Sequence, residues 1–157
     1  HYDFNQAGSY SYEQALRTMR ALGLPMAQIE EQYRRMAFNI VARNQDDHVK
    51  NIAFLMDKTG NWSLSPAFDI TYSYNPTGRW TSTHQMSLNG KRDDFTADDF
   101  TVCEKAIAMK RGRGLEILQG VQQVLMRWPE FAASADVPSE TTDKIASTHR
   151  SNILSLQ

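Results

Sequence analysis

An amphipathic stripe along residues 26–42 constrains the fold of this chain more than any other feature of the sequence. Its apolar members are three or four residues apart, which places them on one face of an α-helix, while most of the charged residues between them fall on the other face. These apolar members are Ile29, Tyr33, Met36 and Ile40. The stripe predicts a long helix, ending near residue 42, whose apolar face must pack against other elements because isolated helices are marginally stable.

The other segments indicate a mainly helical α+β domain. Apolar residues at helical spacing predict further helices at residues 11–22, 96–107, 115–128 and 139–156. The third of these is expected to end at Pro129. The short apolar segment at residues 52–56 predicts a buried strand, which a polar turn joins to a return strand at residues 62–65. Residues 72–94 are rich in Ser, Thr, Asn and Gly and predict a long loop, a kind of segment that is often functional.

The size and charge of the chain limit what it can be. A length of 157 residues allows one sizeable core and excludes a large multi-domain arrangement. The net charge of −1 gives no overall field that would attract nucleic acid or an anionic membrane. Cys103 is the only cysteine, which excludes a disulfide framework and favours the cytoplasm. The sequence shows neither a membrane span nor a signal peptide, and because it does not begin with Met we expect a piece of a longer protein.

A dense group of functional side chains follows the helix of residues 26–42. Residues 43–51 read RNQDDHVKN without apolar periodicity, and Asp69 follows the predicted hairpin. Because antiparallel strands return the chain on itself, Asp46, Asn51 and Asp69 are expected to converge on one ion. Protein kinases place a proton-accepting Asp shortly before a metal-binding Asn, and a later Asp is their main metal ligand. Asp46 precedes Asn51 by five residues, as this arrangement requires, whereas Asp47 is one residue too close and is the second choice.

Several segments of the sequence carry a resemblance to a known family. They read FNIVARNQDDHVKN, AFLMD, WSLSPAFDITYSYNP and HQMSLNGK, together with the opening HYDFN and the later RWPEF. These segments are similar to the C-terminal part of HipA-family serine/threonine kinases, the toxins of bacterial toxin–antitoxin pairs. The similarity fades after Val137. It implies that residues 1–157 form the helical C-terminal, catalytic lobe of a protein-kinase-like fold with a small β-hairpin at the catalytic loop. The N-terminal lobe that clamps the nucleotide would lie outside this chain.

The resemblance also implies which residues use ATP and Mg²⁺. Asp46 would be the catalytic base, and Asn51 and Asp69 would be the metal ligands. The expected nucleotide-binding residues are His48, Lys50, Asn51, Phe68 and Asp69. His48 is equally well interpreted as a hydrogen-bonding residue that fixes the shape of the loop.

The family further implies the partners of the protein. They are a protein substrate, of which aminoacyl-tRNA synthetases are the family's best-known examples, a HipB-like DNA-binding antitoxin and the N-terminal lobe. DNA would be contacted only indirectly, through the antitoxin, and no membrane is expected. The chain by itself is expected to be inactive or weakly active as a kinase.

Two other functions stay open from the residues alone. In a metal-dependent phosphoesterase, four polar side chains would bind one or two ions and activate water without ATP; they are Asp46, Asp47, His48 and Asp69. In a non-catalytic kinase-like module the lobe would only bind a partner. The remaining polar and reactive residues are interpreted as loop charges, helix-end charges or packed core; they are Asp93, Asp94, Asp98, Asp99, Cys103 and Lys110–Arg113.

Overall fold

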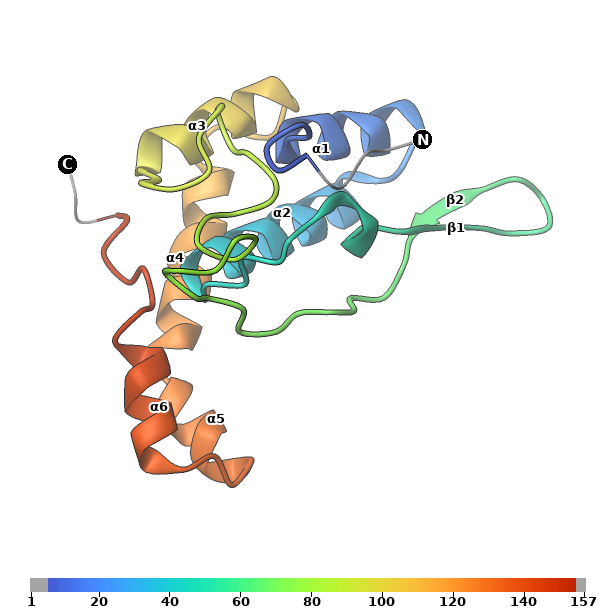
Figure 1. The fold of residues 1–157 in the computed structure, drawn as a ribbon. Helices are drawn as coiled ribbons and strands as arrows, with labels where there is room; N and C mark the ends of the chain where they lie inside the picture. The colour runs from blue at the N-terminus through green and yellow to red at the C-terminus, as the bar shows by residue number, and fades with distance from the viewer. Residues whose placement is uncertain (1–5, 155–157) are drawn as a thin grey trace.

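The computed structural model describes residues 6–154, so the opening HYDFN lies outside the described residues. In chain order the elements are α1 (Tyr12–Ala21), α2 (Met26–Val41), the 3₁₀ helix η1 (Val49–Asn51), β1 (Phe54–Met56), β2 (Trp62–Leu64), α3 (Ala97–Ala106), α4 (Arg113–Leu125), α5 (Trp128–Ser134) and α6 (Ser139–Ala146) (Figure 1). The predicted class, mainly helical α+β with a small hairpin after the second helix, is confirmed. Among the described residues, no helix combines the length and the apolar character that a membrane span requires.

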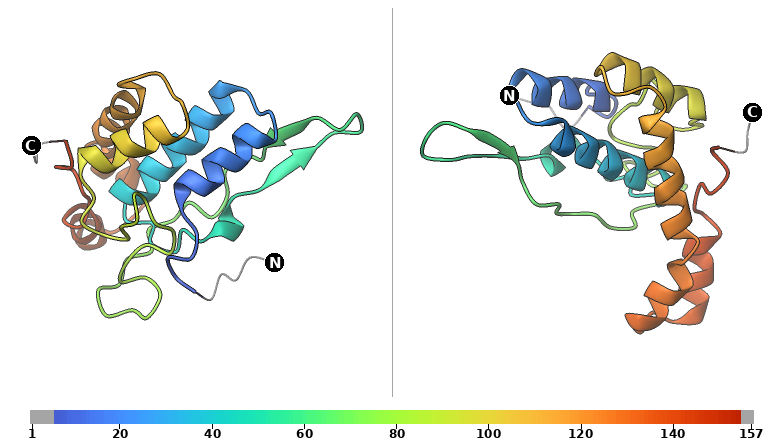
Figure 2. Two further views of the ribbon diagram at one scale, coloured as in Figure 1. Left: turned by 90° about the horizontal axis from the view of Figure 1, so that it is seen from above. Right: turned by 180° about the vertical axis from the view of Figure 1, so that it is seen from behind.

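Helix α2 forms the centre of the core. Helices α1 and α4 pack against it, and α3 packs against both α1 and α4 (Figure 2). The predicted apolar stripe is fully covered as a result: Ile29, Tyr33, Met36 and Ile40 each expose 0% of their surface. The hydroxyl of Tyr33 donates a hydrogen bond to the carbonyl oxygen of Phe100 in α3 at 2.8 Å, which satisfies this polar group inside the core.

Helix α3 begins at a capping box. The Thr96 side chain accepts from the backbone of Asp99, and the Asp99 carboxylate accepts from the Thr96 N–H at 2.8 Å. The same carboxylate accepts from Asn89 Nδ2 at 2.8 Å and from Lys91 Nζ at 2.9 Å. The predicted helix-start role of Asp99 is confirmed, and Asn89 and Lys91 hold the preceding turn against the helix.

The hairpin projects from the helical body, as Figure 1 shows. Its base is anchored where the Leu64 N–H donates to the side-chain oxygen of Gln28 in α2 at 2.7 Å. Farther out, Leu55 and Met56 expose 53% and 59% of their surface. The prediction of a buried strand at residues 52–56 is therefore wrong, because the described part of the chain covers only the base of the hairpin.

The C-terminal helices also differ from the sequence prediction. The helix expected to end at Pro129 ends at Leu125, and Pro129 lies in the first turn of a separate helix, α5. Proline fits there because the first turn of a helix does not use its backbone N–H groups. Helix α6 ends at Ala146, residues 147–154 form turns and a bend, and Leu156 lies outside the described residues.

The long loop at residues 72–94 is confirmed, and its second half is built into the core. Residues 84–88 are buried, and Ser87 exchanges backbone hydrogen bonds with the start of α1. The Ser87 N–H donates to the Tyr10 carbonyl oxygen at 3.0 Å, and the Tyr12 N–H donates to the Ser87 carbonyl oxygen at 2.9 Å. This part of the loop is therefore a fixed support, and the side chain of His84 within it is fully buried.

Two glycines of α4 test the packing of this core. A Cβ atom at Gly114 would lie 2.5 Å from the Tyr33 hydroxyl oxygen, whereas a Cβ atom at Gly120 would meet nothing within 4 Å. We expect Gly114→Ala to lower the free energy of unfolding by about 1–3 kcal/mol through overpacking. Gly120→Ala is the matched control and should raise it by roughly 0.5–1 kcal/mol, because alanine is the better helix former. Urea denaturation measures both changes, and an equally stable Gly114→Ala variant would contradict the packing of α4 on α2.

Candidate functional site

The loop of residues 43–51 begins with a sharp turn at the end of α2. Arg43 adopts a left-handed backbone with φ of 62°, and the Asn44 N–H donates to the Asn39 carbonyl oxygen at 2.9 Å. This is the bond that closes many helix C-termini, although glycine is the usual residue at the left-handed position. A side chain there costs roughly 1–2 kcal/mol. The turn directs the polar run away from the helix and toward the segment that follows the hairpin.

Hydrogen bonds tie this loop to the segment after the hairpin. The Ser73 N–H donates to the Arg43 carbonyl oxygen at 3.1 Å, and the Gln45 N–H donates to the Ser73 carbonyl oxygen at 3.2 Å. The Asn44 side chain donates to the carbonyl oxygen of Asp69 at 3.2 Å. Asp69 has a φ of 55°, a strained conformation of a kind that clusters at functional sites. The backbones of the loop and of Asp69 therefore lie side by side, and Asn44 supports the strained residue.

Within residues 6–154, three side chains on these two segments present oxygen atoms that have no protein partner. The Asn51 Nδ2 donates to the carbonyl oxygen of Asp46 at 3.1 Å, which fixes the amide and leaves its oxygen available. Over residues 6–154, no hydrogen bond or ion pair engages the carboxylates of Asp46 and Asp69. Asp46 is half-buried and Asp69 is exposed. These three side chains can therefore offer oxygen atoms to a ligand without first breaking a contact inside the protein.

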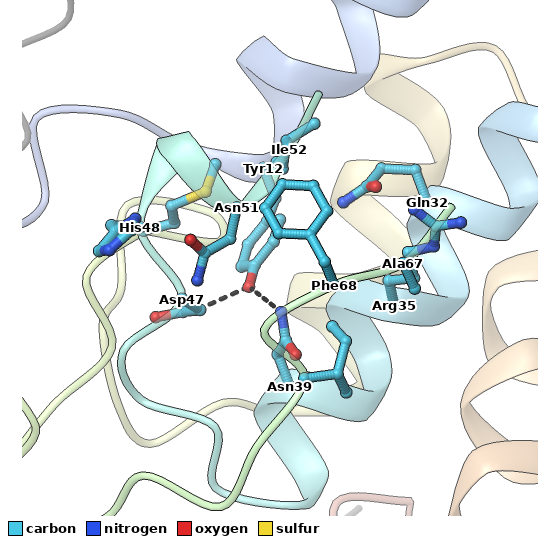
Figure 3. A pocket seen from close by; sticks show the side chains of 12 residues that line it. Tyr12, Gln32, Arg35, Asn39, Asp47, His48, Asn51, Ile52, Ala67 and Phe68 are labelled. Atoms are coloured by element: carbon cyan, nitrogen blue, oxygen red, sulfur yellow. Dashed lines mark hydrogen bonds between the residues drawn. The ribbon is translucent and has the colours of Figure 1, made fainter. Parts of the chain in front are cut away.

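A small cavity lies beside the loop (Figure 3). Of the residues expected to bind nucleotide, His48, Asn51 and Phe68 line it. Its volume is about 10 Å³, which is room for roughly one water molecule, so it cannot enclose a nucleotide. Phe68 exposes 43% of its surface. A nucleotide would have to lie over Phe68 and the loop and be covered from outside the cavity.

Lys50 lies apart from this cavity. It is exposed and lines a second, largely apolar groove with residues of α1 and of the hairpin, among them Thr18, Phe54 and Trp62. The structure therefore brings His48, Asn51 and Phe68 together and directs Lys50 to another groove. The contact of Lys50 with phosphate stays a prediction.

Asp47 is a buried anchor, a role that the sequence did not reveal. Its Oδ2 accepts hydrogen bonds from the Tyr12 hydroxyl at 2.6 Å and from His84 Nδ1 at 2.7 Å, and its Oδ1 accepts from the Gln85 N–H at 2.8 Å. Burial alone would raise the pKa of Asp47, but the hydrogen bonds that the carboxylate accepts from His84, Tyr12 and the Gln85 N–H favour its charged form and outweigh burial, so the pKa lies below its ordinary value. The adjacent aspartates of the loop carry no local signal that tells which one faces inward.

The free oxygens of the loop fit a hard cation. Mg²⁺ prefers oxygen ligands and is usually held by one or two carboxylates together with phosphate oxygens and water. Asp69 and Asn51 offer a carboxylate and an amide oxygen from adjacent segments. Within residues 6–154, no group of three or more His, Cys, Asp and Glu side chains could hold a metal ion. The residues present therefore fit a cation that arrives with a nucleotide better than one bound by the protein alone.

The chain belongs to the family of HipA-like C-terminal domains, since the model of that family matches residues 1–128. Among solved structures it is similar to HipA of Shewanella oneidensis MR-1, in a complex of HipA, HipB and operator DNA, with a TM-score of 0.68 and 17% sequence identity over 92% of this chain. The match covers 34% of that HipA chain, so the present chain spans about a third of its length. No curated protein sequence matches. The resemblance stated from the sequence is confirmed for the family and the fold.

Tyr12 tests the anchor at Asp47. Its hydroxyl donates to the Asp47 carboxylate and accepts from Asn39 Nδ2 at 3.2 Å (Figure 3). We expect Tyr12→Phe to lower the free energy of unfolding by about 1–3 kcal/mol, because the buried Asp47 carboxylate and the buried Asn39 amide each lose a hydrogen-bond partner. Tyr74→Phe is the control: Arg43 lies over this ring, and within the described chain its hydroxyl makes no hydrogen bond. Chemical denaturation that shows equal stability for the two variants would contradict the buried anchor.

The charge of Asp47 also predicts the response of the fold to acid. Burial would raise the pKa of Asp93 as it would that of Asp47, but Arg150 beside Asp93 outweighs burial, and both pKa values lie below their ordinary range. Such groups contribute stability above the unfolded-state pKa of about 3.9 and lose it as the pH falls through the folded-state pKa. The free energy of unfolding should therefore fall steadily below about pH 4. Urea denaturation at a series of pH values measures this loss of stability. Asp93→Asn should make the free energy of unfolding depend less steeply on pH. A free energy of unfolding that rises in acid would refute the prediction.

Proposed function

We propose that this chain is the C-terminal catalytic lobe of a HipA-like serine/threonine protein kinase, which transfers the γ-phosphate of ATP to a protein hydroxyl. The arrangement of Asp46, Asn51 and Asp69 carries the proposal. The amide of Asn51 is held on the carbonyl of Asp46, and among residues 6–154 no contact engages the two carboxylates. Phosphoryl transfer asks little else of a protein, because it needs a proton acceptor and oxygen ligands that hold Mg²⁺ against the phosphates.

Each residue has a distinct role in this proposal. Asp46 accepts the proton of the substrate hydroxyl, while Asn51 and Asp69 hold Mg²⁺. The bound cation would neutralise charge on the phosphate oxygens. Phe68 and His48 line the same cavity as Asn51, which is consistent with contacts to the adenosine or the phosphates. Lys50 reaches the phosphates only if the nucleotide extends toward the groove between α1 and the hairpin.

The proposed kinase is larger than this chain. The chain spans about a third of the Shewanella oneidensis HipA chain, and we propose an N-terminal lobe that clamps the nucleotide from the other side. The structure of that HipA contains HipB and operator DNA, which supports a HipB-like antitoxin as a partner here. Since the net charge of this chain is −1, we expect the antitoxin to supply the main contact with DNA. The substrate would be a cytoplasmic protein, with aminoacyl-tRNA synthetases as the first class to test.

A metal-dependent phosphoesterase fits the geometry less well. Such an enzyme would need Asp46, Asp47, His48 and Asp69 around shared ions. Asp47 is instead buried against Tyr12 and His84, and the described residues hold no metal-binding group of three or more His, Cys, Asp and Glu side chains. A purely structural module, in turn, gives no reason for Asp46, Asn51 and Asp69 to present side-chain oxygens without protein partners, within residues 6–154, on two segments that lie side by side.

Three variants separate the roles of the aspartates. In the chain joined to its nucleotide-clamping lobe, Asp46→Asn should reduce the rate of phosphate transfer by at least about 100-fold, because the proton acceptor is lost, and should leave ATP affinity nearly unchanged. Asp69→Ala should abolish the Mg²⁺ dependence of ATP binding. Asp94→Asn is the control, because Asp94 is exposed and asparagine tolerates its φ of 51°.

Transfer is measured with radiolabelled ATP and binding by calorimetry with a non-hydrolysable ATP analogue. Full activity of Asp46→Asn would refute the assignment of the base. Phosphodiester cleavage without ATP by the parent chain, lost when metal is removed, would replace the proposal with the phosphoesterase.

A further inference from the structure

Arg150 connects the C-terminal segment to the catalytic loop. It lies in the turns after α6, beyond the residues that the family model matches, and exposes only 8% of its surface. Its backbone N–H donates to the Val41 carbonyl oxygen at 2.9 Å, at the end of α2. Its guanidinium donates through one nitrogen to the Ile40 carbonyl oxygen at 2.7 Å and to His84 Nε2 at 2.9 Å, and through the other to Asp93. The residue is thus buried at the point where the polar loop leaves the helix.

This contact determines which nitrogen of His84 carries the proton. A guanidinium group has donors and no acceptor, so His84 Nε2 must be the acceptor in its contact with Arg150. The ring proton then lies on Nδ1, which donates to Asp47 Oδ2 at 2.7 Å. The other tautomer would place a hydrogen between His84 and Arg150 and leave Asp47 without this donor. The hydrogen-bond geometry therefore specifies a neutral Nδ1–H imidazole between a cation and a carboxylate.

The effect of this tautomer reaches the proposed base. Asp47 is next to Asp46 in the chain, and its three hydrogen bonds fix the direction in which the loop passes from residue 46 to residue 47. The carbonyl of Asp46 in turn receives the Asn51 amide. A small displacement of Asp47 would therefore move both the base and a proposed metal ligand, and catalysis is sensitive to displacements of this kind.

We propose that Arg150 is a positioning residue of the phosphotransfer site, which fixes His84 as the Nδ1–H tautomer and through it holds Asp47 beside Asp46. This inference rests on the proposed kinase function. Arg150 does not touch the reacting groups; it acts through two buried residues. The segment after α6 is then a necessary support of the loop of residues 43–51, although it lies outside the residues that the family model matches.

The tautomer is measured on the chain itself, with no need for activity. Long-range proton–nitrogen correlation spectra distinguish Nδ1–H, Nε2–H and doubly protonated imidazoles, and the spectrum of His84→Gln assigns the signal. We expect His84 in the parent chain to be Nδ1–H at neutral pH and to lose this single form in Arg150→Met. Arg127→Met is the matched control, since Arg127 is an exposed partner of Glu130 in the same part of the chain. An Nε2–H or doubly protonated His84 in the parent chain would overturn the proposal.

Kinetics of the joined kinase then test the positioning role. We expect Arg150→Met to lower kcat by about 10-fold or more and to change the KM for ATP by a smaller factor, because the base and Asn51 are misplaced while Phe68 and Asp69 keep their positions. Arg150→Lys, which keeps the charge but lacks the planar set of donors, should recover part of kcat. An unchanged kcat in folded Arg150→Met would overturn the proposal. If the parent kinase transfers no phosphate at all, the proposed function fails instead, and the tautomer measurement still decides the arrangement of Arg150, His84 and Asp47.

Discussion

The buried carboxylate of Asp47 is the contact on which the arrangement of the polar loop depends. It joins three parts of the chain that are distant in sequence: the start of α1 through Tyr12, the loop of residues 72–94 through His84 and Gln85, and the turn after α2. A charge in a protein interior is tolerated only when hydrogen bonds replace its hydration. Since all three donors are needed together, the charge fixes the relative positions of the segments that supply them.

The two adjacent aspartates divide the work of the site. Asp47 is fully satisfied and buried, so it can hold the loop but cannot bind a ligand. Asp46 points its carboxylate to no partner among residues 6–154, so it can react but contributes little to holding the fold. The same contrast separates Asp99, which caps α3, from Asp69, which keeps a strained backbone and a free carboxylate. Asp47 and Asp99 thus hold the fold through their hydrogen bonds, whereas Asp46 and Asp69, on the two segments that lie side by side, are the proposed reactive groups.

The helical core could be predicted because apolar spacing along one helix reports directly which face is covered, as it did for Ile29 and Met36 in α2. The exposure of the hairpin could not be predicted, because an apolar residue such as Leu55 has the same place in the sequence pattern whether or not another part of the protein covers it. The kinase-like spacing of Asp46 and Asn51 was visible in the sequence. The anchor was not, because Tyr12 and His84 lie 35 and 37 residues from Asp47 and only the folded chain brings them together.

The most direct test of the proposed site is to locate the cation on the folded chain. Mn²⁺ added with a non-hydrolysable ATP analogue broadens the nuclear magnetic resonance signals of nearby groups in isotope-labelled protein. We expect the side-chain amide of Asn51 and the backbone N–H of Asp69 to broaden first, while the ring of His84, behind the Asp47 anchor, stays sharper. Broadening elsewhere on the chain, with Asn51 and Asp69 unaffected, would contradict the assignment of these residues as the metal site.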